Sequence, residues 1–139
     1  MRRRIKSWSR ILAALNLGLA SAVMVGCDAG NGSGASNRLP VPPRGFVGNV
    51  EQGKGLYRKY CSACHGRDAT GGRTGPPLLH KIYEPGHHAD LAFYMAVSNG
   101  VRQHHWKFGD MSPVSGVSPE DAGHIVAFIR AEQRKVGIQ

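Results

Sequence analysis

Apolar residues recur with helical spacing in three segments of the chain. The first runs from about residue 50 to residue 64, where apolar side chains and glycines fall at i, i+3, i+4 and i+7. The second runs from about residue 89 to residue 98 and stops at Asn99-Gly100, a pair typical of a helix C-terminus. The third begins after Ser118 and extends to about residue 135. The stripe of the first segment comprises Val50, Gly53, Leu56, Tyr57, Tyr60, Cys61 and Cys64.

The third segment has clear signals at both ends. Ser118 can cap the helix, Pro119 suits its first position, and acidic residues follow in the first turn. Arg134 and Lys135 suit the negative pole of the helix dipole at the other end. No segment shows the convincing two-residue alternation of a strand. The pattern therefore predicts an all-α fold with three main helices and two long loops, at about 66–88 and 101–117.

The first 26 residues have the pattern of a secretory signal peptide. The first ten residues include five basic ones, and an apolar stretch of 15 residues follows, from Ile11 to Val25. A membrane-spanning helix needs about 20 apolar residues. The shorter length favours a signal peptide, with an uncleaved anchor helix as the alternative. Met24-Val25-Gly26-Cys27 resembles a bacterial lipobox, whose cysteine is lipidated after cleavage.

Cysteine usage supports lipidation of Cys27. The chain has three cysteines, and if Cys61 and Cys64 act together, Cys27 is left over. The alternative is an ordinary cysteine near a cleavage site. Asp28 resembles an inner-membrane retention signal of Gram-negative lipoproteins. We therefore expect a Sec-exported protein, lipid-anchored on the periplasmic side of the inner membrane. Residues 27–48 would form a lipidated flexible tether, and residues 49–139 the domain.

The net charge of the chain argues against nucleic acid as a partner. The whole chain carries a formal charge of +9, from 18 basic and 9 acidic residues. Five of the basic residues lie in the predicted signal peptide, so the mature chain keeps 13 against 9, a net side-chain charge of +4. This mild excess suggests partner proteins with acidic surfaces and does not indicate nucleic-acid binding.

The segment Cys61-Ser62-Ala63-Cys64-His65 is the main candidate for chemistry. A structural zinc site needs four ligands, generally two pairs, and no second cysteine pair is present. A thioredoxin-like dithiol begins a helix after a strand, whereas this one ends a helical pattern. A disulfide would leave His65 unexplained. The spacing C-x-x-C-H specifies covalent attachment of c-type haem, with two thioethers and a histidine on iron. A buried haem would also supply the apolar core that three short helices lack.

At this point the chain resembles the monohaem class I cytochromes c of the small bacterial type, over about residues 49–135. Gly53 and Tyr57 stand where that family has a glycine and an aromatic residue, at which the first helix crosses the last. The helix of this chain that would be crossed there carries Ile125 and Phe128. The resemblance implies the cytochrome c fold, with three main helices and long loops wrapped around one covalently bound haem c.

The resemblance also implies the remaining haem contacts. Gly75-Pro76-Pro77-Leu78 looks like the family's GPxL loop, in which the Pro76 carbonyl bonds the histidine ligand and Leu78 packs on the porphyrin. Gly109-Asp110-Met111 looks like the start of the methionine loop, with Met111 as the distal iron ligand. Ser112 departs from the usual Met-Pro pair, although a proline follows it directly.

Other residues compete for the distal position. Met95 lies within the second helical segment, where packing is its expected role. His104 and His105 lie a few residues before Met111 and would give bis-histidine ligation. Trp106 would either donate its indole N–H to a haem propionate or only pack. His87, His88, His104 and His105 form a dense group, interpreted either as surface or propionate-binding residues or as a docking or copper-binding patch.

These features predict an electron carrier that makes no bonds itself and is not an enzyme. Nearby basic residues would steer acidic redox partners, with a salt-dependent rate. An electron-relay subunit of a larger oxidase, reductase or dehydrogenase is the main alternative. A haem sensor or peroxidase-like enzyme with an open iron site is a further one. The basic residues are Arg58, Lys59, Lys81, Arg102 and Lys107.

Overall fold

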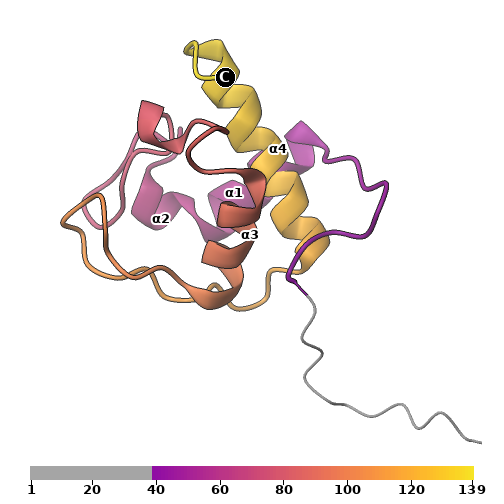
Figure 1. Ribbon diagram of the computed structural model, residues 1–139, viewed down its shortest axis with the longest axis horizontal. Helices are drawn as coiled ribbons and strands as arrows, with labels where there is room; N and C mark the ends of the chain where they lie inside the picture. Colours follow the sequence, from indigo (N-terminus) through magenta and orange to yellow (C-terminus); the bar gives the residue numbers. More distant parts are fainter. Residues whose placement is uncertain (1–38) are drawn as a thin grey trace, which may run out of the picture. The chain divides into compact units, whose positions relative to one another are not determined.

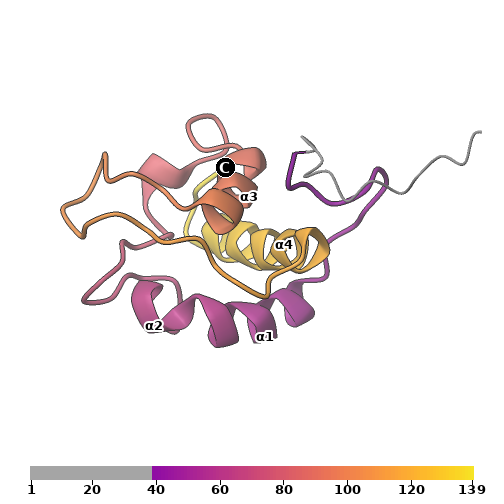
Figure 2. The same ribbon diagram turned by 90° about the horizontal axis from the view of Figure 1, so that it is seen from below.

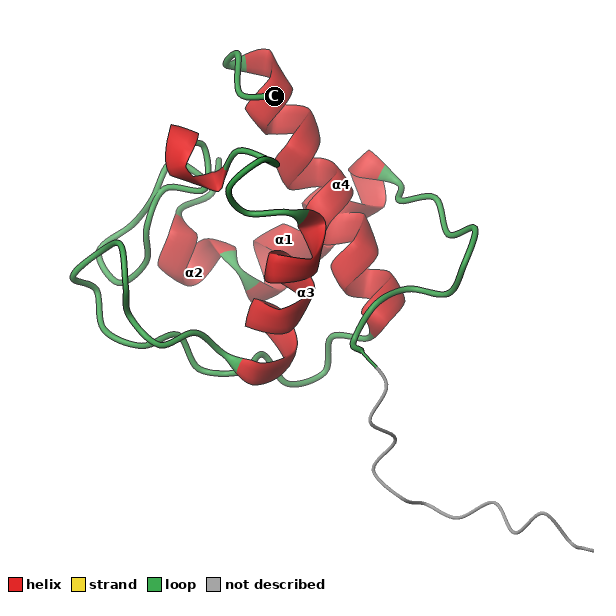
Figure 3. Cartoon of the chain, viewed as in Figure 1, coloured by secondary structure: helices red, strands yellow, loops and turns green. Residues whose placement is uncertain are grey.

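The computed structural model of the protein describes residues 39–139. Figure 3 shows helices joined by long loops in this range, and the one extended pairing there is an isolated antiparallel bridge between Val101 and Met111. The all-α prediction is confirmed for these residues. The elements are α1 (Val50–Tyr60), α2 (Ser62–His65), the 3₁₀ helix η1 (Lys81–Tyr83), α3 (Asp90–Asn99) and α4 (Pro119–Lys135).

The predictions made for the N-terminal part of the chain fall on residues before residue 39. The predicted signal peptide 1–26, the predicted lipidation site Cys27 and residues 28–38 of the predicted tether lie outside the described residues. In the part that is described, no helix combines the length and the apolar character needed to cross a bilayer.

Helices α1 and α4 cross at close range (Figures 1 and 2). A Cβ atom on Gly53 would overlap the carbonyl group of His124 and lie 3.0 Å from the Cβ of Phe128, so only glycine permits this approach. One turn later the Tyr57 side chain is fully buried, with its ring centroid 5.2 Å from that of Phe128. The predicted crossing is therefore present. The buried cluster at this contact comprises Tyr57, Ala69, Leu78, Ile125, Phe128 and Ile129.

The caps of the two long helices follow from the sequence. The Ser118 side chain accepts a hydrogen bond from the Asp121 amide at 3.1 Å, and Asp121 accepts one from the Ser118 amide at 3.4 Å, which completes a capping box. The Asn49 side chain caps α1 by accepting from the Gln52 amide at 2.9 Å. Asn49 also donates its own amide to Nδ1 of His124 at 2.8 Å, which ties the start of α1 to α4.

The predicted helix at 50–64 is divided at Cys61. Helix α1 ends at Tyr60, and α2 begins at Ser62. The Ser62 hydroxyl donates to the Arg58 carbonyl at 2.7 Å, so a side chain takes the acceptor that the backbone would otherwise use. The amide of His65 still donates to the Cys61 carbonyl at 3.0 Å, and the path therefore remains helical on either side of the break.

A buried polar pair in α4 holds the loops that precede α3. The guanidinium of Arg130 donates to Asp90 at 2.8 Å, to the Tyr83 carbonyl at 2.7 Å and to the His88 carbonyl. It also donates to Gln133 at 2.7 Å, and only 8% of Arg130 and 1% of Gln133 are exposed. Because the guanidinium is hydrogen-bonded on all sides, α4 can bury it without leaving an unpaired charge.

The end of the predicted tether contacts the helical domain. The Phe46 ring lies 4.9 Å from the ring of His124 between centroids, and a Cβ on Gly123 would come within 2.5 Å of it. A Cβ on Gly48 would come within 2.6 Å of the Cβ of Ala127. Residues 42–48 therefore pack on α4, because the small residues of this helix face leave room for an aromatic ring.

Candidate functional site

The two cysteines of the C-x-x-C-H segment lie where α1 ends and α2 begins. Cys61 is partly buried and Cys64 is exposed, and both are free thiols with no disulfide between them. Burial and the neighbouring Cys64 raise the pKa of the Cys61 thiol to about 11. A redox-active dithiol requires a thiolate with a lowered pKa. The surroundings of Cys61 therefore disfavour the dithiol alternative.

His65 is oriented by the loop that follows it. Its Nδ1 donates to the Pro76 carbonyl oxygen at 2.9 Å, which assigns the proton to Nδ1 and leaves Nε2 with a free lone pair. A Cβ on Gly75 would lie 2.9 Å from the Cys64 carbonyl oxygen, so the glycine lets this loop approach the cysteine segment closely. An imidazole held by a carbonyl at one nitrogen is prepared to bind a metal through the other.

The loop at residues 66–80 is tied to the helices by hydrogen bonds. The Tyr57 hydroxyl donates to the Gly66 carbonyl at 2.8 Å, and the Leu78 amide donates to the Ala69 carbonyl at 2.8 Å. The side chain of Gln133 donates to the Leu78 carbonyl at 2.9 Å. Leu78 itself is 8% exposed and belongs to the buried cluster. The loop therefore presents Pro76 to His65 from a fixed position.

Met111 lies in the loop between α3 and α4. Backbone hydrogen bonds of 2.9 Å in both directions join Met111 to Val101. The Met111 side chain is partly buried. Met95, the competing methionine, lies within α3, and its sulfur is 4.0 Å from the Asn99 side-chain nitrogen. Met111 is thus held by backbone pairing in a loop, whereas Met95 is part of a regular helix.

Trp106 has a buried donor without a partner. Its Nε1 is buried and makes no hydrogen bond within the described part of the chain. The ring packs edge-on against His80, with 5.0 Å between centroids. Buried N–H groups are nearly always paired. The indole N–H of Trp106 therefore lacks a hydrogen-bond acceptor among the described residues.

Helix α3 has an unusual distribution of apolar residues. Its sequence DLAFYMAVSN is apolar around much of the helix, yet none of its residues is buried by the rest of the domain. Leu91 is 42% exposed, and the apolar residues from Ala92 to Val97 are only partly buried. A helix that is apolar on several sides normally lies in a core.

The chain belongs to the cytochrome c family. The family model described as Cytochrome c matches residues 50–132, from the start of α1 to near the end of α4. No curated protein and no solved structure matches the chain. Members of the family bind haem c, with its iron, through covalent bonds, and they generally carry electrons.

The residues present fit such a haem. Two free thiols and a histidine with an available Nε2 stand in one short segment. The unpaired Nε1 of Trp106 is a donor that a propionate would satisfy, and the incompletely buried apolar side chains of α3 offer a surface for a porphyrin. These three observations are independent of each other. The thiols and the histidine match the attachment points and the iron, the indole N–H matches a propionate, and the apolar side chains match the porphyrin ring.

Sequence reasoning missed Arg130 and Gln133. Both lie in the helix predicted after Ser118, but they were not recognised as buried. Arg130 is adjacent to Ile129 and one turn after Val126, so a charge beside the inward stripe was the available signal. Its carbonyl partners come from loops whose course no periodicity describes.

Proposed function

We propose that the protein is a lipid-anchored periplasmic electron carrier that transfers single electrons through one c-type haem, with His65 and Met111 as the axial iron ligands. The observation that carries this proposal is the 2.9 Å hydrogen bond from His65 Nδ1 to the Pro76 carbonyl, within a C-x-x-C-H segment. This bond prepares Nε2 of the histidine that directly follows the two free thiols.

The haem supplies a reversible one-electron couple when it is bound. Cys61 and Cys64 would fix its position through two thioethers, so that the cofactor cannot dissociate. The Pro76 carbonyl would keep the His65 ring from rotating and make its free nitrogen more basic. Leu78 and the apolar side chains of α3 would exclude water from the porphyrin faces. The residues that hold the haem would then keep their positions when the haem gains or loses an electron.

Met111 is proposed as the second ligand because its loop is anchored. The two hydrogen bonds to Val101 fix the backbone on either side of the side chain. A thioether with a histidine raises the reduction potential relative to two histidines. If His65 and Met111 both bind the iron, no position would be open for substrate chemistry, and this would favour a carrier over an enzyme.

Membrane attachment through Cys27 is supported by sequence alone. The apolar segment before it and the lipobox-like Met24-Val25-Gly26-Cys27 fit a lipoprotein signal. More than one acyl chain is needed for stable anchoring. The Gly/Ser/Asn-rich composition after Cys27 is typical of a linker, which would let the domain meet its partners near the membrane surface.

Acidic redox partners are proposed from five exposed basic side chains of the domain. Arg58 and Lys59 lie at the end of α1, and Lys81 starts η1. Arg102 and Lys107 lie in the loop that carries Met111. All five side chains are exposed. They could accelerate encounter with an acidic surface, in a salt-dependent manner.

Mass spectrometry and a redox titration of the membrane fraction test the function. The parent protein should carry one haem by mass and titrate as a reversible one-electron couple. Cys61→Ser with Cys64→Ser should lose the covalent haem, whereas Cys27→Ser should keep the haem and be released from the membrane. A parent protein without covalent haem would contradict electron transfer, and a membrane-bound Cys27→Ser protein would contradict the lipid anchor alone.

A further inference from the structure

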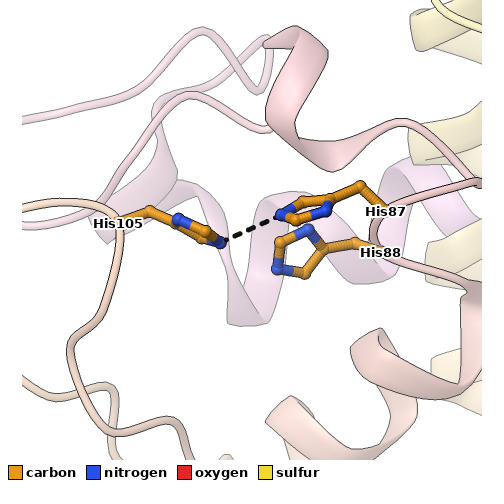
Figure 4. A group of neighbouring side chains, drawn as sticks. All are labelled: His87, His88 and His105. Atoms are coloured by element: carbon orange, nitrogen blue, oxygen red, sulfur yellow. Dashed lines mark hydrogen bonds between the residues drawn. The ribbon is translucent and has the colours of Figure 1, made fainter.

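Three histidines from two separate loops converge on one point. His87 and His88 follow η1, and His105 lies in the loop between α3 and α4 (Figure 4). One ring nitrogen from each of the three lies within 4.8 Å of the others. The Nε2 atoms of His87 and His105 are 3.3 Å apart. We call His87, His88 and His105 the histidine cluster.

The spacing is close to that of a metal site. Imidazole nitrogens bind zinc-like ions at about 2.0–2.1 Å, which places two tetrahedral ligands roughly 3.3 Å apart. The His87–His105 pair already has this separation. The longest separation in the cluster, at most 4.8 Å, would need to shorten by about 1.5 Å, a movement that small side-chain rotations can supply. His87 and His105 are exposed and free to make it.

The least mobile member of the cluster is oriented by the fold. His88 Nδ1 donates to the Ile82 carbonyl at 2.7 Å, which leaves Nε2 available as a ligand. The His88 backbone carbonyl accepts from the buried guanidinium of Arg130. A ring fixed by one carbonyl, on a backbone held by α4, provides the rigid part of the site while the exposed rings adjust.

His104 lies beside the histidine cluster but is not one of its members. Its ring lies 4.2 Å from that of His105 and 5.9 Å from that of His88, measured between centroids. Its Nδ1 is bonded to the Arg102 carbonyl at 2.9 Å. It is outside the group whose ligand nitrogens lie within 4.8 Å of one another. This makes His104 the natural comparison residue.

We propose that His87, His88 and His105 bind one divalent transition-metal ion, with Cu²⁺ preferred over Zn²⁺, in addition to the haem iron. Neutral imidazoles suit borderline ions, and at a given nitrogen site Cu²⁺ binds more strongly than the other divalent first-row metals. A metal binds the neutral form of an imidazole, so the affinity of the histidine cluster should fall as the pH is lowered.

The ion would cross-link two loops whose histidines already lie in contact. One loop follows η1, and the other continues to Met111. A metal that binds the folded protein stabilises it by mass action, in proportion to the logarithm of its free concentration. We therefore expect a metal-dependent rise in Tm, which does not require the haem to be active.

Competition titration of the haem-loaded protein tests the site. The protein is purified without a histidine tag, stripped with a chelator and titrated with Cu²⁺ and with Zn²⁺ against a competing chelator. One ion per chain should bind beyond the haem iron, more tightly for Cu²⁺, with a rise in Tm and nitrogen couplings in the Cu²⁺ resonance spectrum. Loss of an outer-shell partner alone weakens metal sites roughly 10- to 100-fold. His87→Ala or His105→Ala should therefore weaken binding by at least about 100-fold.

The control is His104→Ala, which removes an adjacent imidazole and should change the affinity by less than about 10-fold. Unchanged binding in His87→Ala and His105→Ala would overturn the proposal. An equal loss in His104→Ala would also overturn it, because the ion would then be held by a general histidine patch. Because His87 and His105 are exposed, loss of folding does not complicate the comparison.

Discussion

Tyr57 joins α1, α4 and the loop at residues 66–80 through one side chain. Its ring packs on Phe128, and its hydroxyl donates to the Gly66 carbonyl at 2.8 Å. Gly66 directly follows His65, so this hydrogen bond fixes the chain next to the proposed iron ligand. A fully buried tyrosine with a bonded hydroxyl is thus both a core residue and a support for the site.

Tyr57 makes stability sensitive to alkaline pH. Burial is the main cause that raises the pKa of its hydroxyl far above the ordinary value of 10.0. In the unfolded chain Tyr57 loses its proton near pH 10, whereas the folded protein retains it. Unfolding is therefore increasingly favoured above about pH 10, and the contribution is fully present below that pH. We expect the free energy of unfolding to fall above pH 10 in the parent and to fall less steeply in Tyr57→Phe.

Chemical denaturation at pH 8 to 11 measures this effect. Tyr57→Phe also loses a hydrogen bond, which should lower stability at pH 8 by about 0.5–1.5 kcal/mol. The control is Tyr60→Phe, whose ring lies at the end of the same helix under the Lys59 ammonium. An alkaline slope that is the same in the parent and in Tyr57→Phe would contradict the assignment.

At the scale of elements, the α1–α4 crossing depends on Gly53. A methyl group at this position would overlap the His124 carbonyl, which belongs to helix backbone and cannot easily move. Overpacking of this kind costs about 1–3 kcal/mol, and a forced separation of the helices would add to it. We expect Gly53→Ala to lower the free energy of unfolding by about 1–3 kcal/mol or more. The same substitution should reduce the fraction of the expressed protein that carries haem.

Gly55 provides a matched control on the same helix. A Cβ built there has no atom within 4 Å, and the residue is exposed. Gly55→Ala should therefore stabilise the protein by about 0.5–1 kcal/mol through helix propensity alone. Denaturant unfolding of the two variants compares them directly. Equal effects of the two substitutions would show that the helices do not cross at Gly53.

Arg130 connects α4 to the loops before α3. Arg130→Ala would remove the guanidinium donor from the Tyr83 and His88 carbonyls and from the Gln133 side chain. Gln133 is only 1% exposed, so water cannot readily replace the donor there. We expect a loss of about 2–4 kcal/mol, since hydrogen bonds to charged groups contribute about 1.5–3 kcal/mol each and some acceptors regain water. The exposed Arg134→Ala should change stability by less than about 0.5 kcal/mol. Similar small effects of both substitutions in denaturation experiments would contradict the role of Arg130.

The helices could be predicted from the sequence because their signals are local. Ser118, Pro119 and the first-turn acids define the start of α4, and Asn99-Gly100 defines the end of α3. The division at Cys61 was not predicted, because it depends on whether the Ser62 hydroxyl takes the Arg58 carbonyl. The interactions of Arg130 were not predicted either, since they depend on where distant loops place their carbonyls.

The whole domain is organised around one end, where the loops meet. The cysteine segment and the Pro76 loop were identifiable as motifs, and the structure places His65 and Pro76 in hydrogen-bond contact. The histidines were visible as a dense group. Which of them share a centre could not be read from spacing, because His87 and His105 are 18 residues apart and meet only through the path of two loops.

The optical spectrum of ferric Met111→Ala beside that of the parent tests the central claim most directly. The parent should show the near-infrared charge-transfer band of a methionine sulfur bound to ferric haem iron, and Met95→Leu should keep it. Met111→Ala should lose the band, bind carbon monoxide in the ferrous state and have a lower reduction potential. Persistence of the band in Met111→Ala, its absence from the parent, or carbon monoxide binding by the parent would contradict a His65/Met111 electron carrier.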